Sequence, residues 1–154
     1  MLDDIDLKIL SLLQENGRMA HSAIGKEVDL TGPSVHSRIQ RLEESGVIAG
    51  YTALIQPDLV EQGLLAYIRI QTTVTEDLFE IFEEYVRSNA AILECHDMAG
   101  EDSYFLKVRV RDTAMLQELI AEIRRYLPGC RTITSIAMLT IKEFNASGSV
   151  SDVD

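Results

Sequence analysis

The fold of the first part of the chain is decided by residues 31–46, TGPSVHSRIQRLEESG, which carry the signals of one short amphipathic helix. Thr31 can cap its N-terminus, and Pro33 fits the first turn because an N–H there has no partner inside the helix. Gly46 can end the helix in the left-handed conformation. Apolar residues recur along one face between these signals, at Val35, Ile39 and Leu42. The stretch therefore predicts a helix with one packed and one exposed face.

Two further helices are predicted before this one. Asp3 or Asp4 can cap the first, and Asn16-Gly17 ends it, with the glycine in the left-handed conformation. Ser22 can cap a second helix that runs through Val28. A turn of about three residues then leads into the third helix, which is the spacing of a helix-turn-helix.

The segment after Gly46, VIAGYTALI, reads as a strand interrupted by Gly50. We expect it to form a small wing or to pair with another chain. The N-terminal part is thus predicted to be a winged helix-turn-helix domain over residues 1–50, and a strand and linker follow over residues 51–63.

The exposed face of the third helix contrasts with the charge of the whole chain. The 154 residues have a formal net charge of -11, yet this helix carries His36, Arg38 and Arg41 and no acid before Glu43. So acidic a chain does not attract nucleic acid over its whole surface, and any DNA binding must come from a local patch. Two interpretations remain open: the arginines contact DNA, or they lie on a solvated face and pair with nearby glutamates.

Residues 64–144 alternate between strand and helix patterns. The predicted strands and helices, in chain order, are 65–74, 76–88, 92–98, 104–111, 113–127 and 132–144. The order βαββαβ predicts an α+β, ferredoxin-like domain: a four-stranded antiparallel sheet with both helices on one face. The tail, residues 145–154, is small, polar and acidic and is predicted to be flexible.

The last predicted strand is apolar on both sides. One side carries Ile133, Ala137, Leu139 and Ile141, and the other carries Ile136 and Met138. Because two helices cover only one face of the sheet, the second apolar surface requires another subunit. We therefore expect a homo-oligomer, assembled through the C-terminal sheet.

Composition and missing motifs narrow the classes of function. Hydrophobic residues make up 46% of the chain, which suffices for a packed core. No apolar run has membrane-spanning length and no secretion signal is recognisable, so we expect a cytoplasmic protein without a membrane partner. The two cysteines, Cys95 and Cys130, form neither a disulfide framework nor a zinc pattern. Hydrolase, zinc-protease and phosphate-loop motifs are missing, so we expect no enzyme, no cofactor and no metal site.

Longer stretches of the sequence resemble a known family. Residues 2–18, LDDIDLKILSLLQENGR, and 37–53, SRIQRLEESGVIAGYTA, are very similar to the opening of the Lrp/AsnC (feast/famine) family of prokaryotic transcription regulators. Residues 94–112, ECHDMAGEDSYFLKVRVRD, and 134–143, TSIAMLTIKE, resemble that family's ACT-like, ferredoxin-fold sensing domain. The likeness extends over residues 2–144.

The resemblance implies a DNA-binding N-terminal domain, dimers built by the C-terminal sheet, and often octamers. It also implies an amino-acid effector, bound between sensing domains of neighbouring dimers, that shifts assembly or affinity for double-stranded DNA. The family's recognition helix maps onto the third helix, so the implied DNA contacts are Ser34, His36, Ser37, Arg38 and Arg41. Arginine suits this role because its planar fork donates two parallel hydrogen bonds to phosphate or to guanine.

The implied effector site lies in the second half of the chain. The family's effector loop maps onto Gly100, Glu101, Asp102, Ser103 and Tyr104, and another subunit contributes the last strand around Thr134 and Ser135. Backbone donors of the loop can receive a carboxylate, and Glu101 or Asp102 can receive an ammonium group. Many members have an aspartate directly before the tyrosine, where this chain has Ser103, so the ammonium contact does not transfer residue by residue.

The alternative function belongs to another class. It is an amino-acid-binding regulatory subunit whose helical N-terminus makes protein contacts only. That alternative predicts no DNA affinity beyond that of an acidic protein, and ligand binding that does not depend on residues 1–55.

Overall fold

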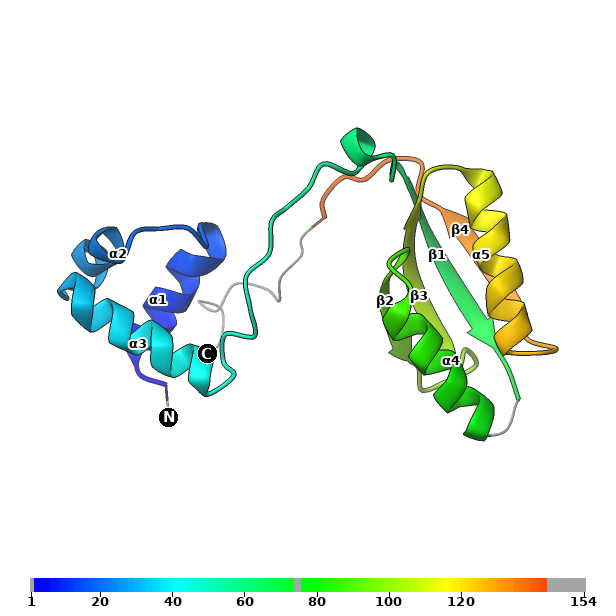
Figure 1. Cartoon of the computed structure of the whole chain (residues 1–154), viewed down its shortest axis with the longest axis horizontal. Helices are drawn as coiled ribbons and strands as arrows, with labels where there is room; N and C mark the ends of the chain where they lie inside the picture. The colour runs from blue at the N-terminus through cyan, green and yellow to red at the C-terminus, as the bar shows by residue number, and fades with distance from the viewer. Residues whose placement is uncertain (1, 74–75, 144–154) are drawn as a thin grey trace. The chain divides into compact units, whose positions relative to one another are not determined.

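The structure, a computed structural model, describes residues 2–73 and 76–143 (Figure 1). It contains two compact units, one formed by the residues up to Leu54 and one by Ile55–Ile141. The tail predicted to be flexible, 145–154, lies outside the described residues.

The first unit is the predicted three-helix arrangement, with α1 at Asp4–Glu15, α2 at His21–Val28 and α3 at Gly32–Glu44. Asp3 caps α1 and Thr31 caps α3, each through a side-chain oxygen that accepts a backbone N–H. The inward faces of the three helices share one core, made of Ile9, Leu10, Leu12, Ile24, Val35, Ile39 and Leu42. The helix-turn-helix prediction is confirmed.

Two local predictions in this unit are wrong. Gly17 is not left-handed; α1 ends instead at an extended Asn16. Ser22 does not cap α2, because the helix begins at His21 and its cap residue is Ala20, two residues earlier than predicted, which makes no side-chain hydrogen bond. The left-handed conformation occurs instead at the end of α2, at Asp29 with a φ angle of 54°, and after α3, at Gly46 with a φ angle of 75°, where it was predicted.

The wing prediction is also wrong for the single chain. Residues 47–56 form no strand, and Tyr51, Leu54 and Ile55 are exposed. A strand requires a partner for its backbone groups, and no described segment of this chain supplies one here. Pairing of this segment with another chain remains a prediction.

The second unit is the predicted ferredoxin-like fold. After the short 3-10 turn at Pro57–Val60, its elements in chain order are β1 Leu64–Gln71, α4 Glu76–Ser88, β2 Ile92–Asp97, β3 Tyr104–Val110, α5 Thr113–Tyr126 and β4 Arg131–Ile136. The sheet has the order β2-β3-β1-β4, and every neighbouring pair is antiparallel. Both helices cover the same face of the sheet (Figure 1).

The alternation of β1 and β3 builds the core between sheet and helices. Ala66, Ile68 and Ile70 of β1 are fully buried, as the sequence pattern predicts. They join side chains from β3, α4 and α5, among them Leu106, Val108, Phe82, Leu119 and Ile123.

The last strand is shorter than predicted. β4 ends at Ile136 rather than continuing to residue 144; among the described residues it pairs with β1 alone, and β1 begins at Leu64, only two residues before the partner of Ile136, Ala66. The apolar residues that follow are strongly exposed in the single chain: Met138 has 95% of its surface exposed, and Leu139 and Ile141 are also exposed.

Candidate functional site

A cluster of charged residues joins α1 to the exposed face of α3. Nη1 of Arg38 donates to Asp6 Oδ1 at 2.7 Å and to both Asp3 oxygens, at 2.7 and 2.9 Å. Nη2 of Arg41 donates to Asp6 Oδ2 at 2.6 Å. The acids that the sequence of α3 lacks are therefore supplied by α1. Of the two open interpretations, ion pairing is what the structure shows, although the partners are aspartates of another helix rather than glutamates.

The members of this cluster differ in how deeply their side chains are buried. The Asp6 side chain is completely buried, whereas those of Arg38 and Arg41 are 25% and 59% exposed. The hydrogen bonds to Asp3 and then Asp6 raise the pKa of Arg38. The pKa of Asp3 is lowered, first by Arg38 and then by the backbone N–H of Asp6 that its carboxylate accepts as the cap of α1. Asp3 thus caps α1 and also pairs with Arg38 on the exposed face of α3.

The other residues with an implied DNA role lie early in α3 and are exposed. The hydroxyl of Ser34 is 2.8 Å from that of Thr31, and Ser37 donates to the Pro33 carbonyl at 3.2 Å. His36 lies against His21 of α2, with the ring centroids 5.2 Å apart. The structure thus places all five predicted residues on one helix, and it ties the two arginines to α1.

The loop between β2 and β3 is held to the end of β1. Ser103 Oγ accepts the N–H of Thr72 at 3.2 Å, and the Ser103 N–H donates to the Ile70 carbonyl at 2.7 Å. Asp102 accepts a hydrogen bond from Gln71 at 3.2 Å and lies 3.6 Å from Arg69. These contacts place a chain reversal, with Gly100 at a φ angle of 142°, beside two cavities.

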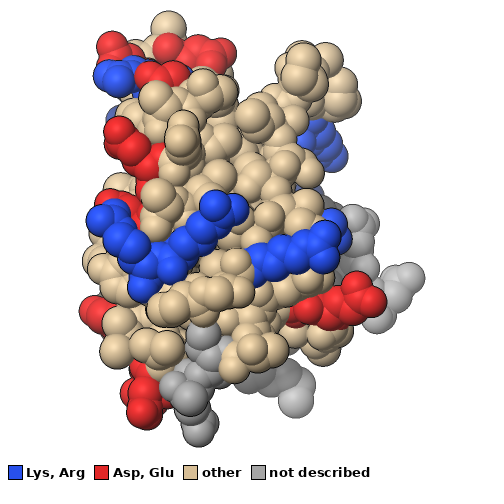
Figure 2. Space-filling view, turned by 90° about the vertical axis from the view of Figure 1, so that its right-hand side faces the viewer, with Lys and Arg blue, Asp and Glu red and all other residues tan. Residues whose placement is uncertain are grey.

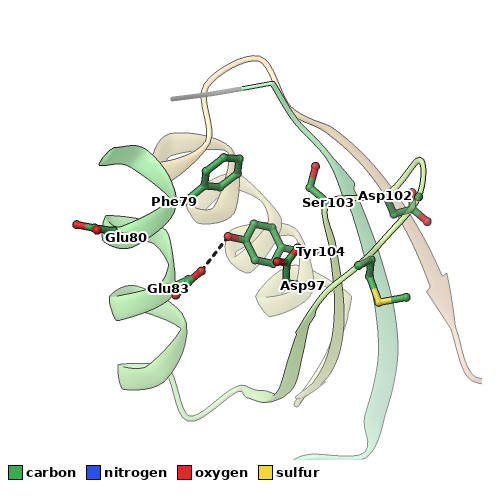
Figure 3. Close-up of a pocket in the computed structure, with 9 residues that line it drawn as sticks. Phe79, Glu80, Glu83, Asp97, Asp102, Ser103 and Tyr104 are labelled. Carbon is green, nitrogen blue, oxygen red and sulfur yellow. Dashed lines mark hydrogen bonds between the residues drawn. The ribbon is translucent and has the colours of Figure 1, made fainter. Parts of the chain in front are cut away.

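The first cavity, of about 430 Å³, lies between this loop and α4 (Figure 3). Four predicted effector residues line it: Gly100, Asp102, Ser103 and Tyr104. Its remaining lining was not predicted from the sequence: Phe79, Glu80, Glu83, Asp97 and Met98. Phe79 and Glu83 are four residues apart and so share a helix face, but the sequence did not show that this face meets the loop.

The first cavity is acidic and partly aromatic. Tyr104 donates to Glu83 Oε1 at 3.2 Å, and in Figure 3 Phe79, Glu83 and Tyr104 point toward one another while Glu80 points away. Burial and then the charge of Glu83 raise the pKa of Tyr104. Burial, Glu83 and Asp97 raise the pKa of Cys95 to about 11. Glu83 Oε2 also accepts a hydrogen bond from Arg87 Nη2 at 2.9 Å, outside the lining. The described residues of the lining itself include four acids and no lysine or arginine, so the cavity suits a cationic group better than an anionic one.

The second cavity, of about 450 Å³, lies on the other side of the same loop. Glu101, the fifth predicted loop residue, lines it with Gln71, Thr72, Thr73, Gly129 and Arg131. Thr134 and Ser135 line neither cavity of their own chain; they lie on the edge strand β4, opposite Ile68 and Tyr67 of β1. Their predicted approach to the loop of another subunit remains a prediction.

Positive charge gathers on a further surface of the second unit. Figure 2 shows the face on which α5 and β4 lie in Figure 1, and lysine and arginine side chains form a band across it. Arg124 and Arg125 end α5 and Arg131 begins β4, all exposed. Arg124 Nη2 donates to the Thr132 hydroxyl at 2.7 Å, which joins the end of α5 to the start of β4.

No helix among the described residues is long and apolar enough to cross a bilayer.

The two units match two described domain types. The AsnC-type helix-turn-helix domain matches residues 2–43, which include α1, α2 and nearly all of α3. The Lrp/AsnC ligand binding domain matches residues 65–147, which include the sheet and both of its helices.

Similar proteins cover nearly the whole chain. The leucine-responsive regulatory protein of Haemophilus influenzae is 38% identical over 146 residues, 94% of this chain and 88% of that protein. That of Escherichia coli K12 is 37% identical, over 94% of this chain and 89% of that protein.

Two solved structures superimpose closely. A transcriptional regulator from Neisseria meningitidis in complex with L-methionine has a TM-score of 0.88 and 30% identity, over 96% of this chain and 97% of that chain. A feast or famine regulatory protein from M. tuberculosis complexed with L-methionine has a TM-score of 0.83 and 31% identity, over 96% of this chain and 99% of that chain. With both domain types matched in order, the chain belongs to the Lrp/AsnC family of transcriptional regulators.

Proposed function

We propose that this protein is a transcription regulator that binds specific DNA sequences through α3 and responds to an amino acid bound at the 100–104 loop. The observation that carries the proposal is the pairing of two sites in one chain: an exposed helix-turn-helix face and an acidic cavity in a ligand-binding domain. An effector that binds two assemblies with different affinities shifts the balance between them. The effector would in this way change the arrangement of paired recognition helices.

The DNA contacts proposed for α3 are those of a recognition helix in the major groove. Ser34 and Ser37 lie in its first half, where short side chains let the backbone approach DNA. His36 contributes from the same exposed face, beside α2. Arg38 and Arg41 lie further along, where their ion pairs with α1 decide whether each of them reaches DNA.

The effector proposed for the first cavity is an apolar amino acid. Its ammonium group would be received by the carboxylates of Glu83 and Asp97, and its side chain by Phe79 and Met98. The bound L-methionine of two similar structures, and the leucine response for which the similar regulators are named, support this class of ligand. The lining contains no basic residue, so donors for the ligand carboxylate would come from the loop backbone and from a second subunit.

The subunit arrangement proposed is a dimer built through the C-terminal sheet, with higher assemblies such as an octamer formed from dimers. The exposed apolar residues after β4 support it, because they would lose contact with water in an assembly.

The experiment that tests the function is a genomic DNA pull-down with the purified protein, with and without a mixture of the common amino acids. Recovery of a few discrete fragments supports a regulator and supplies its operator. A change in those fragments on adding amino acids supports effector binding. No enrichment under either condition contradicts DNA recognition and favours the alternative, a regulatory subunit that binds amino acids but not DNA.

A further inference from the structure

We propose that Asp6 is a positioning residue of the DNA-binding helix, a role that rests on the proposed function. Its buried carboxylate holds Arg38 and Arg41 against α1 and determines which of the two arginines reaches DNA.

Asp6 is a buried carboxylate with a full set of partners. Its side chain is completely buried, and both of its oxygens accept hydrogen bonds from arginine. Oδ2 also accepts the backbone N–H of Asp3 at 3.3 Å. A buried carboxylate is tolerated only where cations and donors satisfy it, and withdrawal of one partner leaves a charge without compensation. Since Asp6 belongs to α1 and the arginines to α3, these bonds hold the exposed face of α3 in register with α1.

Arg38 is held by two aspartates at once. A single nitrogen of its guanidinium lies between 2.7 and 2.9 Å from three carboxylate oxygens, two of Asp3 and one of Asp6. Turning this side chain toward a base would withdraw a cation from the buried carboxylate of Asp6. Because three carboxylate oxygens hold this side chain and only 25% of it is exposed, Arg38 stays with α1 when DNA binds and does not read a base.

Arg41 is more exposed than Arg38. Among the described residues its only ion pair is the one between Nη2 and Asp6, and its side chain is 59% exposed. The planar guanidinium can keep this bond and still donate from Nη1 and Nε. Arg41 is therefore the arginine that α3 presents to a phosphate, and Asp6 fixes its orientation.

The experiment compares two variants that lose the same charge from the same helix turn. Asp6→Asn keeps the size of the side chain but weakens its hold on both arginines. Asp4→Asn is the matched control, because Asp4 is exposed and makes no ion pair among the described residues. Fluorescence anisotropy measures binding of each full-length variant to the operator and to a scrambled fragment, over a range of salt concentrations. Circular dichroism establishes that each variant is folded.

We expect Asp6→Asn to lower the ratio of specific to non-specific affinity by about tenfold relative to Asp4→Asn, because released arginines bind phosphate without register. We also expect the salt slope on the scrambled fragment to grow by about one, because Arg38 becomes free for a phosphate. Equal ratios and slopes for the two variants would overturn the role of Asp6. A wild-type protein that does not distinguish operator from scrambled DNA would contradict the proposed function instead.

A second measurement needs no variant and so holds if Asp6→Asn fails to fold. In nitrogen-15 spectra of the wild-type protein, the guanidinium signals of Arg38 and Arg41 are followed as operator DNA is added. We expect those of Arg41 to shift and those of Arg38 to stay in place. A shift of the Arg38 signals comparable to that of Arg41 would overturn the assignment.

Discussion

Gly25 illustrates how single residues set the approach of α2 to the turn before α3. A Cβ at this position would overlap the carbonyl oxygen of Leu30. Gly32, in the first turn of α3, is different, because a Cβ there would meet its nearest atom, the backbone N of Ser22, at an ordinary 3.7 Å. The two glycines are therefore required to different degrees, although the sequence alone does not distinguish them.

We predict that Gly25→Ala lowers the free energy of unfolding of the first unit by about 1–3 kcal/mol, the range typical of overpacking. Gly32→Ala, its matched control, should leave stability nearly unchanged. Urea denaturation followed by circular dichroism measures both. Equal stability of the two variants would show that the turn at Leu30 shifts freely.

At the scale of a single element, the cap of α5 makes the stability of the folded state depend on pH. Asp112 accepts the N–H of Met115 at 2.9 Å as the cap of α5, and it pairs with Arg111 at 3.0 Å. The hydrogen bond from Met115 and then that from Arg111 lower the pKa of Asp112 below its ordinary value of 3.8. A lowered pKa means that this carboxylate stabilises the folded state above about 3.8 and loses that effect as the pH falls through its folded value.

We predict that Asp112→Asn, which keeps a capping oxygen, lowers stability near neutral pH but not well below pH 3.8, where the wild-type carboxyl is protonated as well. Urea midpoints of the two proteins across this range measure the effect. A difference in midpoint that is the same at acid and neutral pH would show that the charge of Asp112 does not stabilise α5.

The cavity between α4 and the loop after β2 yields a prediction about the effector. Glu83→Gln should weaken binding of L-methionine or L-leucine about tenfold or more, because a charge-assisted hydrogen bond to ammonium is worth about 1.5–3 kcal/mol. Glu84→Gln is the control: Glu84 lies on the same helix, is 80% exposed and is not part of the cavity lining. Titration calorimetry measures both. Equal affinities would exclude Glu83 as the ammonium partner, and binding of L-glutamate as tight as that of L-methionine would contradict an acidic site.

At the scale of the whole molecule, the single chain leaves a short segment rich in apolar residues without cover. Met138, Leu139 and Ile141 follow the end of β4 and are exposed. The segment 47–55, predicted as a strand, also pairs with no other described segment of the chain. Both features are accounted for if copies of the chain pair with one another.

We predict that Leu139→Asp shifts the protein toward smaller assemblies, because a charge placed in an apolar contact loses its hydration. Met115→Asp serves as the control, since Met115 is a partly exposed apolar residue of the first turn of α5. Light scattering coupled to size-exclusion chromatography measures the mass of each assembly. An unchanged mass for Leu139→Asp would place the interface elsewhere.

The sequence by itself determined the elements and the two-domain order. Helical periodicity, caps such as Thr31 and strand alternation as in β1 are local, since they depend on neighbours within a few residues. The predictions that failed at Gly17, at Ser22 and at the end of β4 concern element ends, and the wing is a predicted strand that does not form in the single chain. There the outcome depends on whether a partner strand or a capping group is present.

Only the tertiary structure decided the chemistry of the candidate sites. Arg38 and Arg41 read from the sequence as cations on a helix face without acids, yet Asp3 and Asp6, more than thirty residues away, are their partners. In the same way, Glu83 reaches Tyr104 across the space between α4 and β3. The physical reason is that charge pairing acts through distances in space, and residues distant in sequence come within hydrogen-bonding range only after the core has packed.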